Sequence, residues 1–452
     1  MHKKISILLL FTVLMLMMAA CSDKKENTNS QGENNGDDKG GIEGISYVYD
    51  SSTSGEITFW TYDPLFADVI VEFNKVYPNI KVNFTPFEYG EHHSQLQTTL
   101  NAGSGAPDVA QVSAGEIPRY ESEGLLEDLL QPPFDAGRYK EYQAEYNWER
   151  YMSLDGKRLL GIPWDVHPGV FFYRPDLYEQ VGLPTDPEDL GEFLQEPENV
   201  LEAAKLLAAN DLYMYEWRDS PAVHYGDALG YFDSNLNYTR NNERMIEMID
   251  IVKQGVQLGW APQMGLFSDE GKQLIKQGKV ASFPLGISGA RHMENMLPDQ
   301  AGKWRVTKMP LDLNVELGGS TFVIPAQGKN KEAAWAFAEW IATSEEAWKI
   351  YAEYAVQPGF THIGQLPWYQ EHTNDFLGGQ EDFKLYTTIP ENIPKRKMTI
   401  LDGQAWPVFI DSINEAIDKN IDSRSVLQQI EDDTLKKLAP DIQKLKEEFG
   451  ID

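Results

Sequence analysis

Cysteine is nearly absent from the 452-residue sequence, where Cys21 is the only one. A single cysteine leaves the folded part without an internal disulfide, so its stability has to come from its hydrophobic core. Positive charge is also scarce: 39 Lys and Arg residues stand against 70 Asp and Glu residues, for a net charge of −31. Because nucleic-acid binding needs a basic surface, this balance argues against a nucleic-acid partner.

The sequence also lacks an apolar run long enough for a comfortable membrane span. Ile5–Met18 is apolar over 14 residues and follows the basic residues His2-Lys3-Lys4, as in a signal peptide. It leads into Met18-Ala19-Ala20-Cys21, which resembles the lipobox at which a bacterial signal peptide is cut before a lipid-bearing cysteine. We therefore predict a signal peptide over residues 1–20 and a palmitate-type lipid anchor on Cys21. An ordinary secretory signal with a chance cysteine is the alternative.

A polar segment follows the predicted cleavage site. Residues 21–55 are rich in Asn, Asp, Lys, Gly and Ser, which predicts a disordered tether. The remaining chain is too long for a single core, so we expect two or more lobes. No second linker of this kind follows, which indicates lobes that interleave their chain segments rather than lobes in tandem.

Catalytic and metal motifs are missing as well. Gly286-Ile287-Ser288-Gly289 lacks the spacing of a nucleophile elbow, and the segment Gly103–Asp108 is neither a Walker loop nor a dinucleotide fingerprint. His92 and His93 point about 100° apart on a helix, so they do not form a two-ligand metal face. We predict no enzyme activity, cofactor or metal. A carboxylate pair can always be found among 70 acids, so a secreted glycoside hydrolase stays an alternative.

What the sequence does contain is an alternation of strands and helices. Predicted strands cover residues 56–62, 80–84 and 108–112, with helices over 65–77, 91–102 and 113–122, which is typical of a parallel sheet covered by helices. Further strands are predicted at 280–285 and 321–325. Helices are predicted at 200–209, 242–258, 268–277, 331–342, 345–354, 408–420 and 425–438. The fold class is therefore α/β.

One stretch, Gly161–Asp176, indicates a crossing between two bodies. The predicted strand Val170–Tyr173 is flanked by Pro163 and Pro175, and proline is rare inside a sheet. Gly161 to Pro163 is expected to belong to a hinge. The polar and aromatic residues of the crossing, Trp164, Asp165 and His167, are predicted to touch a ligand held between the lobes; a turn cap before Pro168 is the alternative for Asp165.

Four segments, in the correct order, resemble one family. They are Leu100–Val112, Asp155–Asp176, Gly278–Ala281 and Gly318–Ala342. The chain, from about Glu56 to Leu438, is similar to the carbohydrate-binding solute-binding proteins of bacterial ABC importers, the group that includes maltose-binding protein.

The resemblance implies a type II periplasmic-binding-protein fold of two lobes joined by several crossings, with the sugar in the cleft. It implies one lobe of residues 56–164 plus 310–354 and another of residues 165–309 plus 355–452. The expected protein is a monomeric, lipid-anchored receptor on the extracellular face of the membrane that delivers a sugar, favoured to be an oligosaccharide, to ABC permease subunits. A binding protein for a non-sugar solute is a further alternative.

Candidate ligand contacts follow from the fold. Loops beyond the carboxyl ends of parallel strands meet ligands, which selects Trp60, Tyr62, Glu88, Tyr89, Gln111 and Ser113. Asp63 is expected to be a helix N-cap rather than a contact, and Trp60 has core packing as its alternative. In the second lobe, the resemblance implies an aromatic wall at Trp217 and Tyr225. Gly286 and Ser288 follow the last clear strand, where the family often carries a tryptophan that this chain lacks, and Arg291 is expected to take a polar role instead. Gly318 and Gly319 let the backbone approach a ligand closely, and Trp406 is expected to close the cleft.

Overall fold

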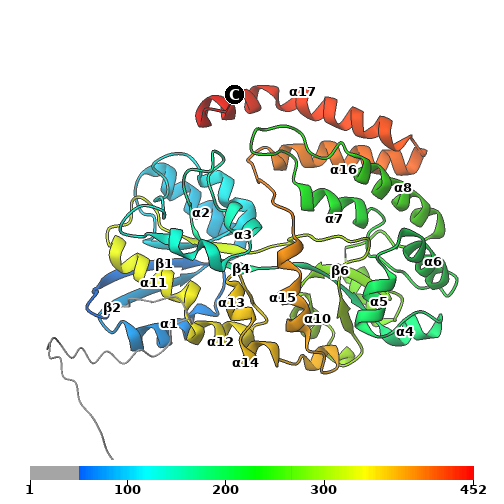
Figure 1. Ribbon diagram of the computed structural model, residues 1–452, viewed down its shortest axis with the longest axis horizontal. Helices are drawn as coiled ribbons and strands as arrows, with labels where there is room; N and C mark the ends of the chain where they lie inside the picture. Colours follow the sequence, from blue (N-terminus) through cyan, green and yellow to red (C-terminus); the bar gives the residue numbers. More distant parts are fainter. Residues whose placement is uncertain (1–49, 266, 452) are drawn as a thin grey trace, which may run out of the picture. The chain divides into compact units, whose positions relative to one another are not determined.

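The structure, a computed structural model, describes residues 50–265 and 267–451 (Figure 1). The predicted signal peptide, Cys21 and most of the predicted tether lie outside the described residues. Within the described part, no helix is both long and apolar enough to cross a membrane.

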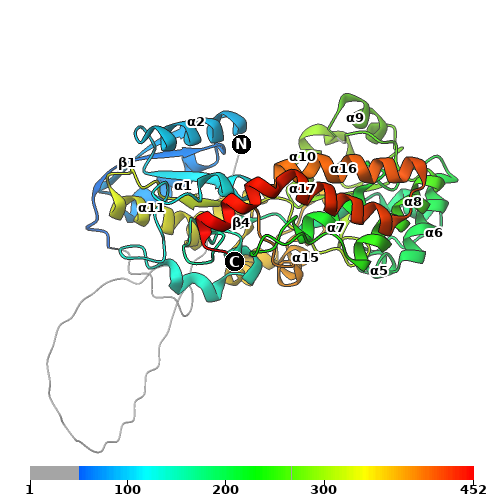
Figure 2. The same ribbon diagram turned by 90° about the horizontal axis from the view of Figure 1, so that it is seen from above.

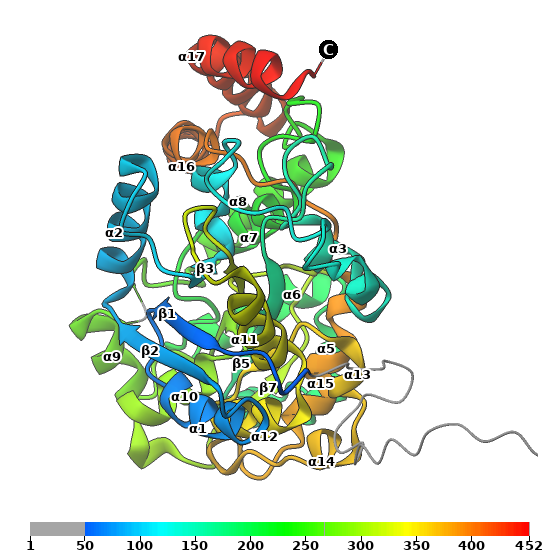
Figure 3. The ribbon, with the colours of Figure 1, turned by 90° about the vertical axis from the view of Figure 1, so that its left-hand side faces the viewer.

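A six-stranded sheet has the order β2-β1-β3-β8-β4-β9. Its strands are β1 (Gly55–Thr61), β2 (Ile80–Pro86), β3 (Val109–Ser113), β4 (Ile162–Val166), β8 (Ser320–Val323) and β9 (Gln357–Pro358). β1 pairs with β2 and β3 in parallel, as predicted, whereas β8 runs antiparallel to β3 and β4. Figure 3 shows β1 and β2 side by side.

Local sequence explains the first strand–helix unit. Ile57, Phe59 and Thr61 alternate toward the core along β1, and α1 (Phe66–Val76) buries Phe66, Val69 and Phe73 on one face. α2 (Tyr89–Ala102) ends at Gly103, whose φ of 71° is left-handed. The predicted helix 113–122 is instead a 3-10 helix, Ala114–Tyr120, because Pro118 inside it has no N–H to donate.

A second sheet has three antiparallel strands in the order β6-β5-β7. They are β5 (Gly169–Tyr173), β6 (Ser282–Gly286) and β7 (Arg305–Thr307). Val170 and Phe172 of β5 belong to the hydrophobic core that also underlies the first sheet, whereas Phe171 and Tyr173 belong to a second core. β5 is therefore buried on both faces, as its continuous apolar run predicts.

Helices surround both cores. On the second core lie α4 (Pro175–Gln180), α5 (Pro187–Phe193), α6 (Pro197–Ala208), α7 (Ser220–Leu229), α8 (Glu243–Leu258), α16 (Asp402–Lys419) and α17 (Ser423–Phe449). The others are α3 (Glu145–Glu149), α9 (Asp269–Lys276), α10 (Gly289–Met296), α11 (Lys331–Thr343), α12 (Glu345–Glu353), α13 (Thr361–Gly364), α14 (Pro367–Gln370) and α15 (Asp382–Thr388). The remaining 3-10 helices are Ala136–Tyr142, Pro298–Gln300, Asp375–Leu377 and Pro390–Asn392.

The two C-terminal helices are longer than predicted and lie side by side (Figures 1 and 2). α17 was expected to end at Leu438, but it continues through Pro440 to Phe449. Proline removes a single helical hydrogen bond there, and the buried side chains of Leu438 and Leu445 lie on either side of it. Packing on the second core therefore outweighs the local signal.

The predicted crossing is confirmed. The chain leaves the first sheet at the end of β4 and enters the second at β5, with His167 and Pro168 between them. A second segment runs antiparallel to it: Gly169 N donates to Val315 O at 2.8 Å, and Leu317 N donates to His167 O at 2.9 Å. Two hydrogen-bonded segments therefore connect the sheets.

The first sheet reaches a little past the predicted lobe boundaries. Of the residues Gly161 to Pro163, expected in the hinge, Ile162 and Pro163 instead belong to β4, which extends to Val166 and pairs with β9. Glycine is required at 161, because a Cβ there would lie 2.5 Å from Thr321 Oγ1. The division into residues 56–164 plus 310–354 and residues 165–309 plus 355–452 stays a prediction.

Candidate ligand-binding site

A buried charged network holds the two crossing segments together. Glu316, with 3% of its side chain exposed, accepts hydrogen bonds from His167 N at 2.6 Å and from Tyr146 Oη at 2.7 Å. Arg150 Nη1 lies 3.7 Å from Glu316 Oε1, and Arg150 Nη2 donates to Gly318 O at 2.6 Å. Arg150 and Glu316 thus each have an opposite charge nearby and at least one hydrogen bond, which offsets the cost of burying them.

Asp165, at the end of β4, is also fully occupied by the protein. Its Oδ1 accepts hydrogen bonds from Ser320 N and Ser320 Oγ, each at 2.6 Å, and its Oδ2 lies 2.8 Å from His167 Nε2. Burial alone would raise the pKa of Asp165, but the bonds from His167 and Ser320 lower it. Burial lowers the pKa of His167, and the bond to Asp165 outweighs this and raises it.

The strand ends of the first sheet gather an aromatic group. The ring of Tyr62, which follows β1, packs edge-on against Tyr89 with centroids 5.1 Å apart and lies 5.3 Å from His93. His93 Nε2 accepts a hydrogen bond from Ser113 N at 3.3 Å. Three predicted contacts, Tyr62, Tyr89 and Ser113, are therefore brought together, and Tyr89 is exposed.

The other predicted contacts from this sheet lie elsewhere. Gln111 is buried beneath the group, where its Nε2 donates to Ser320 Oγ at 3.2 Å. Glu88 is exposed just before α2, and Trp60 is half-buried against Phe87. Asp63 was expected to cap the helix, but the N-cap position of α1 is Leu65, and Asp63 instead accepts a bond from Leu65 N at 3.1 Å in the turn before the helix.

Trp164 packs in the hydrophobic core instead of facing solvent. Its side chain is 1% exposed, and its ring centroid lies 5.0 Å from that of Tyr351 and 5.1 Å from that of Phe66. Burial of this kind leaves no surface for a ligand unless the lobe itself rearranges.

Two tryptophans on the second core are exposed. Trp217, just before α7, has 45% of its surface exposed, and Trp406, in α16, has 40%; the other nine are buried or half-buried. Arg218 Nε donates to Asn414 Oδ1 at 2.9 Å, which ties the Trp217 loop to α16. Asn414 lies eight residues after Trp406, about 12 Å along the helix. Tyr225 is half-buried and donates to Asn242 Oδ1 at 3.2 Å.

Three predicted glycine contacts lie beside His167 or Asp165. A Cβ on Gly318 would lie 3.0 Å from His167 Cβ, and one on Gly286 would lie 3.7 Å from it. Gly319 has a φ of 89° and lies against Asp165 O. Ser288, half-buried, follows β6 and precedes α10.

Arg291 is exposed on α10, with its guanidinium carbon 4.5 Å from the centroid of the Tyr354 ring. Burial raises the pKa of Asp63, Asp165 raises it further, and Arg291 and His167 lower it. Asp63, Asp165, His167 and Arg291 therefore share one electrostatic neighbourhood.

Sequence reasoning missed Glu316, Arg150 and Tyr146. The three side chains come from separate segments and meet only in the folded chain. The one local signal was the position of Glu316, two residues before the predicted ligand contacts Gly318 and Gly319. Glu116 was also missed: it lies in the 3-10 helix directly after β3 and forms an ion pair with Arg119 at 2.9 Å.

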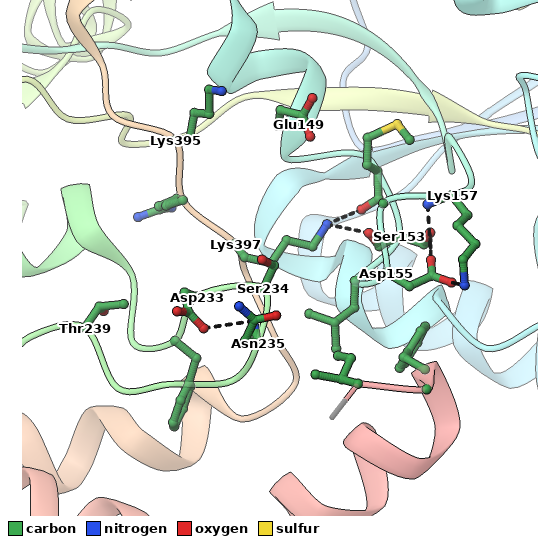
Figure 4. A pocket seen from close by; sticks show the side chains of 18 of the residues that line it. Glu149, Ser153, Asp155, Lys157, Asp233, Ser234, Asn235, Thr239, Lys395 and Lys397 are labelled. Carbon is green, nitrogen blue, oxygen red and sulfur yellow. Dashed lines mark hydrogen bonds and ion pairs between the residues drawn. The ribbon is translucent and has the colours of Figure 1, made fainter.

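A cavity of about 840 Å³ is lined by residues that were not predicted to contact ligand (Figure 4). It is lined by the turn 152–157, residues 232–235, the segment 395–397 and the end of the chain at 449–451. Lys397 Nζ crosses it to donate to Ser153 O at 2.9 Å. None of the predicted contacts lines this cavity. Among the described residues, no group of three or more His, Cys, Asp and Glu side chains is placed to hold a metal ion.

The chain matches the family model described as bacterial extracellular solute-binding protein over residues 60–348. It belongs to this family. Among similar members, the arabinooligosaccharide-binding protein of Bacillus subtilis (strain 168) is 27% identical over 377 residues, covering 78% of this chain and 85% of that protein. The predicted family is therefore confirmed. Both the family model and this relative are described as binding proteins.

Solved structures of solute-binding proteins show the same fold. An extracellular solute-binding protein of family 1 has a TM-score of 0.73 at 20% identity, covering 85% of this chain and 99% of its own. The galacto-N-biose-/lacto-N-biose I-binding protein of the ABC transporter from Bifidobacterium longum has a TM-score of 0.68 at 21% identity, covering 86% and 98%. The predicted two-lobed α/β fold of type II is confirmed.

Proposed function

We propose that this solute-binding protein is the carbohydrate receptor of an ABC importer and that its ligand is an oligosaccharide. The observation that carries the proposal is the exposure of Trp217 and Trp406 in a chain whose other tryptophans are covered. Exposed aromatic faces stack on the apolar faces of sugar rings. Tyr89 offers a third exposed ring at the edge of the first sheet.

The relatives support the same ligand class. One is named for arabino-oligosaccharides, and one solved neighbour was bound to lacto-N-biose. Several separate stacking surfaces suit a chain of sugars better than a single ring. We propose that Tyr62, Tyr89 and Ser113 on one side, and Trp217, Trp406, Ser288 and Arg291 on the other, contact this ligand.

The two crossing segments supply the mechanism. Ligand binds the open form on one lobe, and contacts from the other lobe then stabilise the closed form, which the permease subunits recognise. The sheets are joined by hydrogen-bonded backbone at residues 167–169 and 315–317. Rotation there leaves the strand pairing within each sheet intact.

We also propose a monomer tethered to the extracellular face of the membrane through lipid on Cys21. A soluble receptor of this kind would diffuse away unless an anchor kept it close to its permease. Mass spectrometry of the protein from membranes should find an acylated N-terminal cysteine, and Cys21→Ala should release the protein into the medium. An unmodified Cys21 in the membrane fraction contradicts the anchor.

Isothermal titration with arabinotriose and lacto-N-biose tests the ligand class. The wild type should bind at least one of them, and Trp217→Ala should weaken that binding at least tenfold. Val71→Ala is the control, because Val71 is an exposed apolar residue on α1 that lies outside the proposed contacts. Failure of the wild type to bind any sugar in this set contradicts the proposal. New reducing ends after incubation would favour a glycoside hydrolase.

A further inference from the structure

His167 is the most tightly held side chain of the first crossing. Its N–H donates to Glu316 Oε1 at 2.6 Å, and its C=O accepts a bond from Leu317 N at 2.9 Å. The side chain packs beside Gly318 and Gly286, where added Cβ atoms would lie 3.0 Å and 3.7 Å from His167 Cβ. Backbone and packing therefore fix where the imidazole ring lies.

The two ring nitrogens have different surroundings. Nε2 lies 2.8 Å from Asp165 Oδ2, while Asp165 Oδ1 is held by both donors of Ser320. Nδ1 has no hydrogen-bond partner within residues 50–265 and 267–451, and 22% of the His167 side chain is exposed. One nitrogen is thus committed to Asp165, and the other is left for a molecule from outside.

Charged and titratable groups face this ring from every neighbouring element. Asp165 lies on β4, Glu316 lies on the second crossing, and Arg150 lies in the segment after α3. His292 on α10 and Asp63 after β1 also interact electrostatically with His167, and Arg291 acts on both of these residues. Asp165 is the only one of the carboxylates that bonds the ring itself.

We propose that His167 Nδ1 is a hydrogen-bonding contact for the ligand and that Asp165 is the positioning residue that sets whether this nitrogen donates or accepts. The inference rests on the proposed carbohydrate-binding function and assigns these two residues different roles in it. Asp165 acts through His167 and not on the ligand itself, because it is 5% exposed and its oxygens already bond Ser320 and His167.

The chemistry follows from the fixed geometry. When His167 is protonated, Nε2–H donates to Asp165 and Nδ1–H donates a charge-assisted bond to a sugar oxygen. When the ring is neutral, Asp165 still requires the proton on Nε2, so Nδ1 carries a lone pair and accepts from a sugar hydroxyl. The stronger, charge-assisted bond is lost as pH rises, and the affinity should fall about fivefold.

Asp165→Asn separates positioning from simple packing. The Ser320 donors still require an oxygen at the Oδ1 position, so the amide NH₂ takes the place of Oδ2 and faces His167 Nε2. Nε2 then accepts, and the neutral ring carries its proton on Nδ1. This variant should therefore keep Nδ1 as a donor across the pH range, and its affinity should vary little with pH.

The experiment measures arabinotriose and lacto-N-biose binding by calorimetry from pH 5.5 to pH 9, and the ring ¹⁵N shifts of histidine-labelled, ligand-free protein over the same range. His372→Gln is the matched control, since His372 is also a part-exposed histidine beside a carboxylate, with Nδ1 3.6 Å from Asp382 Oδ1. The wild type and this control should lose about fivefold in affinity with rising pH. Asp165→Asn and His167→Gln should show flat profiles.

The NMR titration supplies a readout that a purely structural role would not move. In the ligand-free wild type, the pKa of the His167 ring should lie above that of an ordinary histidine, because Asp165 bonds the ring, and the neutral form should carry its proton on Nε2. In Asp165→Asn the proton of the neutral ring should move to Nδ1. A flat wild-type affinity profile, or a slope that survives in either variant, overturns the inference. A wild type that binds neither sugar contradicts the proposed function and the inference with it.

Discussion

Glu316→Gln should strongly destabilise the ligand-free protein. The substitution preserves shape but leaves Arg150, whose side chain is 3% exposed, without its buried countercharge. It also replaces one acceptor oxygen by an NH₂ group, which is a donor. Because Tyr146 Oη and His167 N donate to the two oxygens of Glu316, one of these bonds is lost. Breaking a buried pair by removing one partner costs about 3–5 kcal/mol, and we expect a loss of that size in the free energy of unfolding.

Urea unfolding at pH 7, followed by tryptophan fluorescence, measures this loss. The double variant Arg150→Met/Glu316→Gln removes both charges, so it should be more stable than the sum of the single losses predicts, by about 1–3 kcal/mol. Glu72→Gln is the control, because Glu72 pairs with Lys75 at 2.6 Å on the surface of α1 and should change stability by less than about 1 kcal/mol. A loss below about 1 kcal/mol for Glu316→Gln, or strictly additive losses, would refute the reasoning.

Three further predictions concern the same region. Trp164→Ala should lower the free energy of unfolding by about 3–5 kcal/mol, because the ring fills the core; a melting temperature equal to that of the wild type would contradict its burial. Gly161→Ala should cost about 1–3 kcal/mol in urea unfolding, since the new methyl group meets Thr321 and backbone; unchanged stability would show that Thr321 yields freely. Because the pKa of His167 is raised in the folded state, its contribution to stability is complete below about pH 6.5 and is lost as pH rises through the folded pKa. Glu121 and Glu216, whose pKa burial raises to about 7 and to about 8, titrate in both proteins, so chemical unfolding from pH 6 to 9 should show a steeper decline in the wild type than in His167→Gln, and equal slopes would contradict the prediction.

Elements with local signals could be predicted from the sequence. The Asn242 side chain caps α8 by accepting a bond from Met245 N, and the predicted start at 242 is within one residue of the observed one. Gly103 ends α2 for an equally local reason, its left-handed backbone. The crossing between the sheets was predicted from prolines on either side of an apolar strand, but that reason was wrong: Pro163 lies inside β4, and β5 is the central strand of the second sheet.

The site was less predictable, because its partners are distant in the sequence. Asp165 was predicted as a ligand contact, because a carboxylate beside a tryptophan is a typical grip on a sugar. The structure instead places it in a strand buried on both faces, where Ser320 satisfies it from 155 positions away. Trp164 lies in the same strand. All five residues of β4 are buried, so the strand has no alternation of apolar and polar residues from which its burial could be predicted.

The paired crossings also constrain how the chain can change length. Their backbones are joined at Gly169–Val315 and His167–Leu317, so the segments between the sheets must match in span. One residue inserted between Val166 and Gly169 would shift the register and turn β5 over, exchanging the side chains it presents to the two cores. Insertions should therefore be tolerated in exposed turns such as 233–235, whereas in homologous chains the two crossings should gain or lose residues only together.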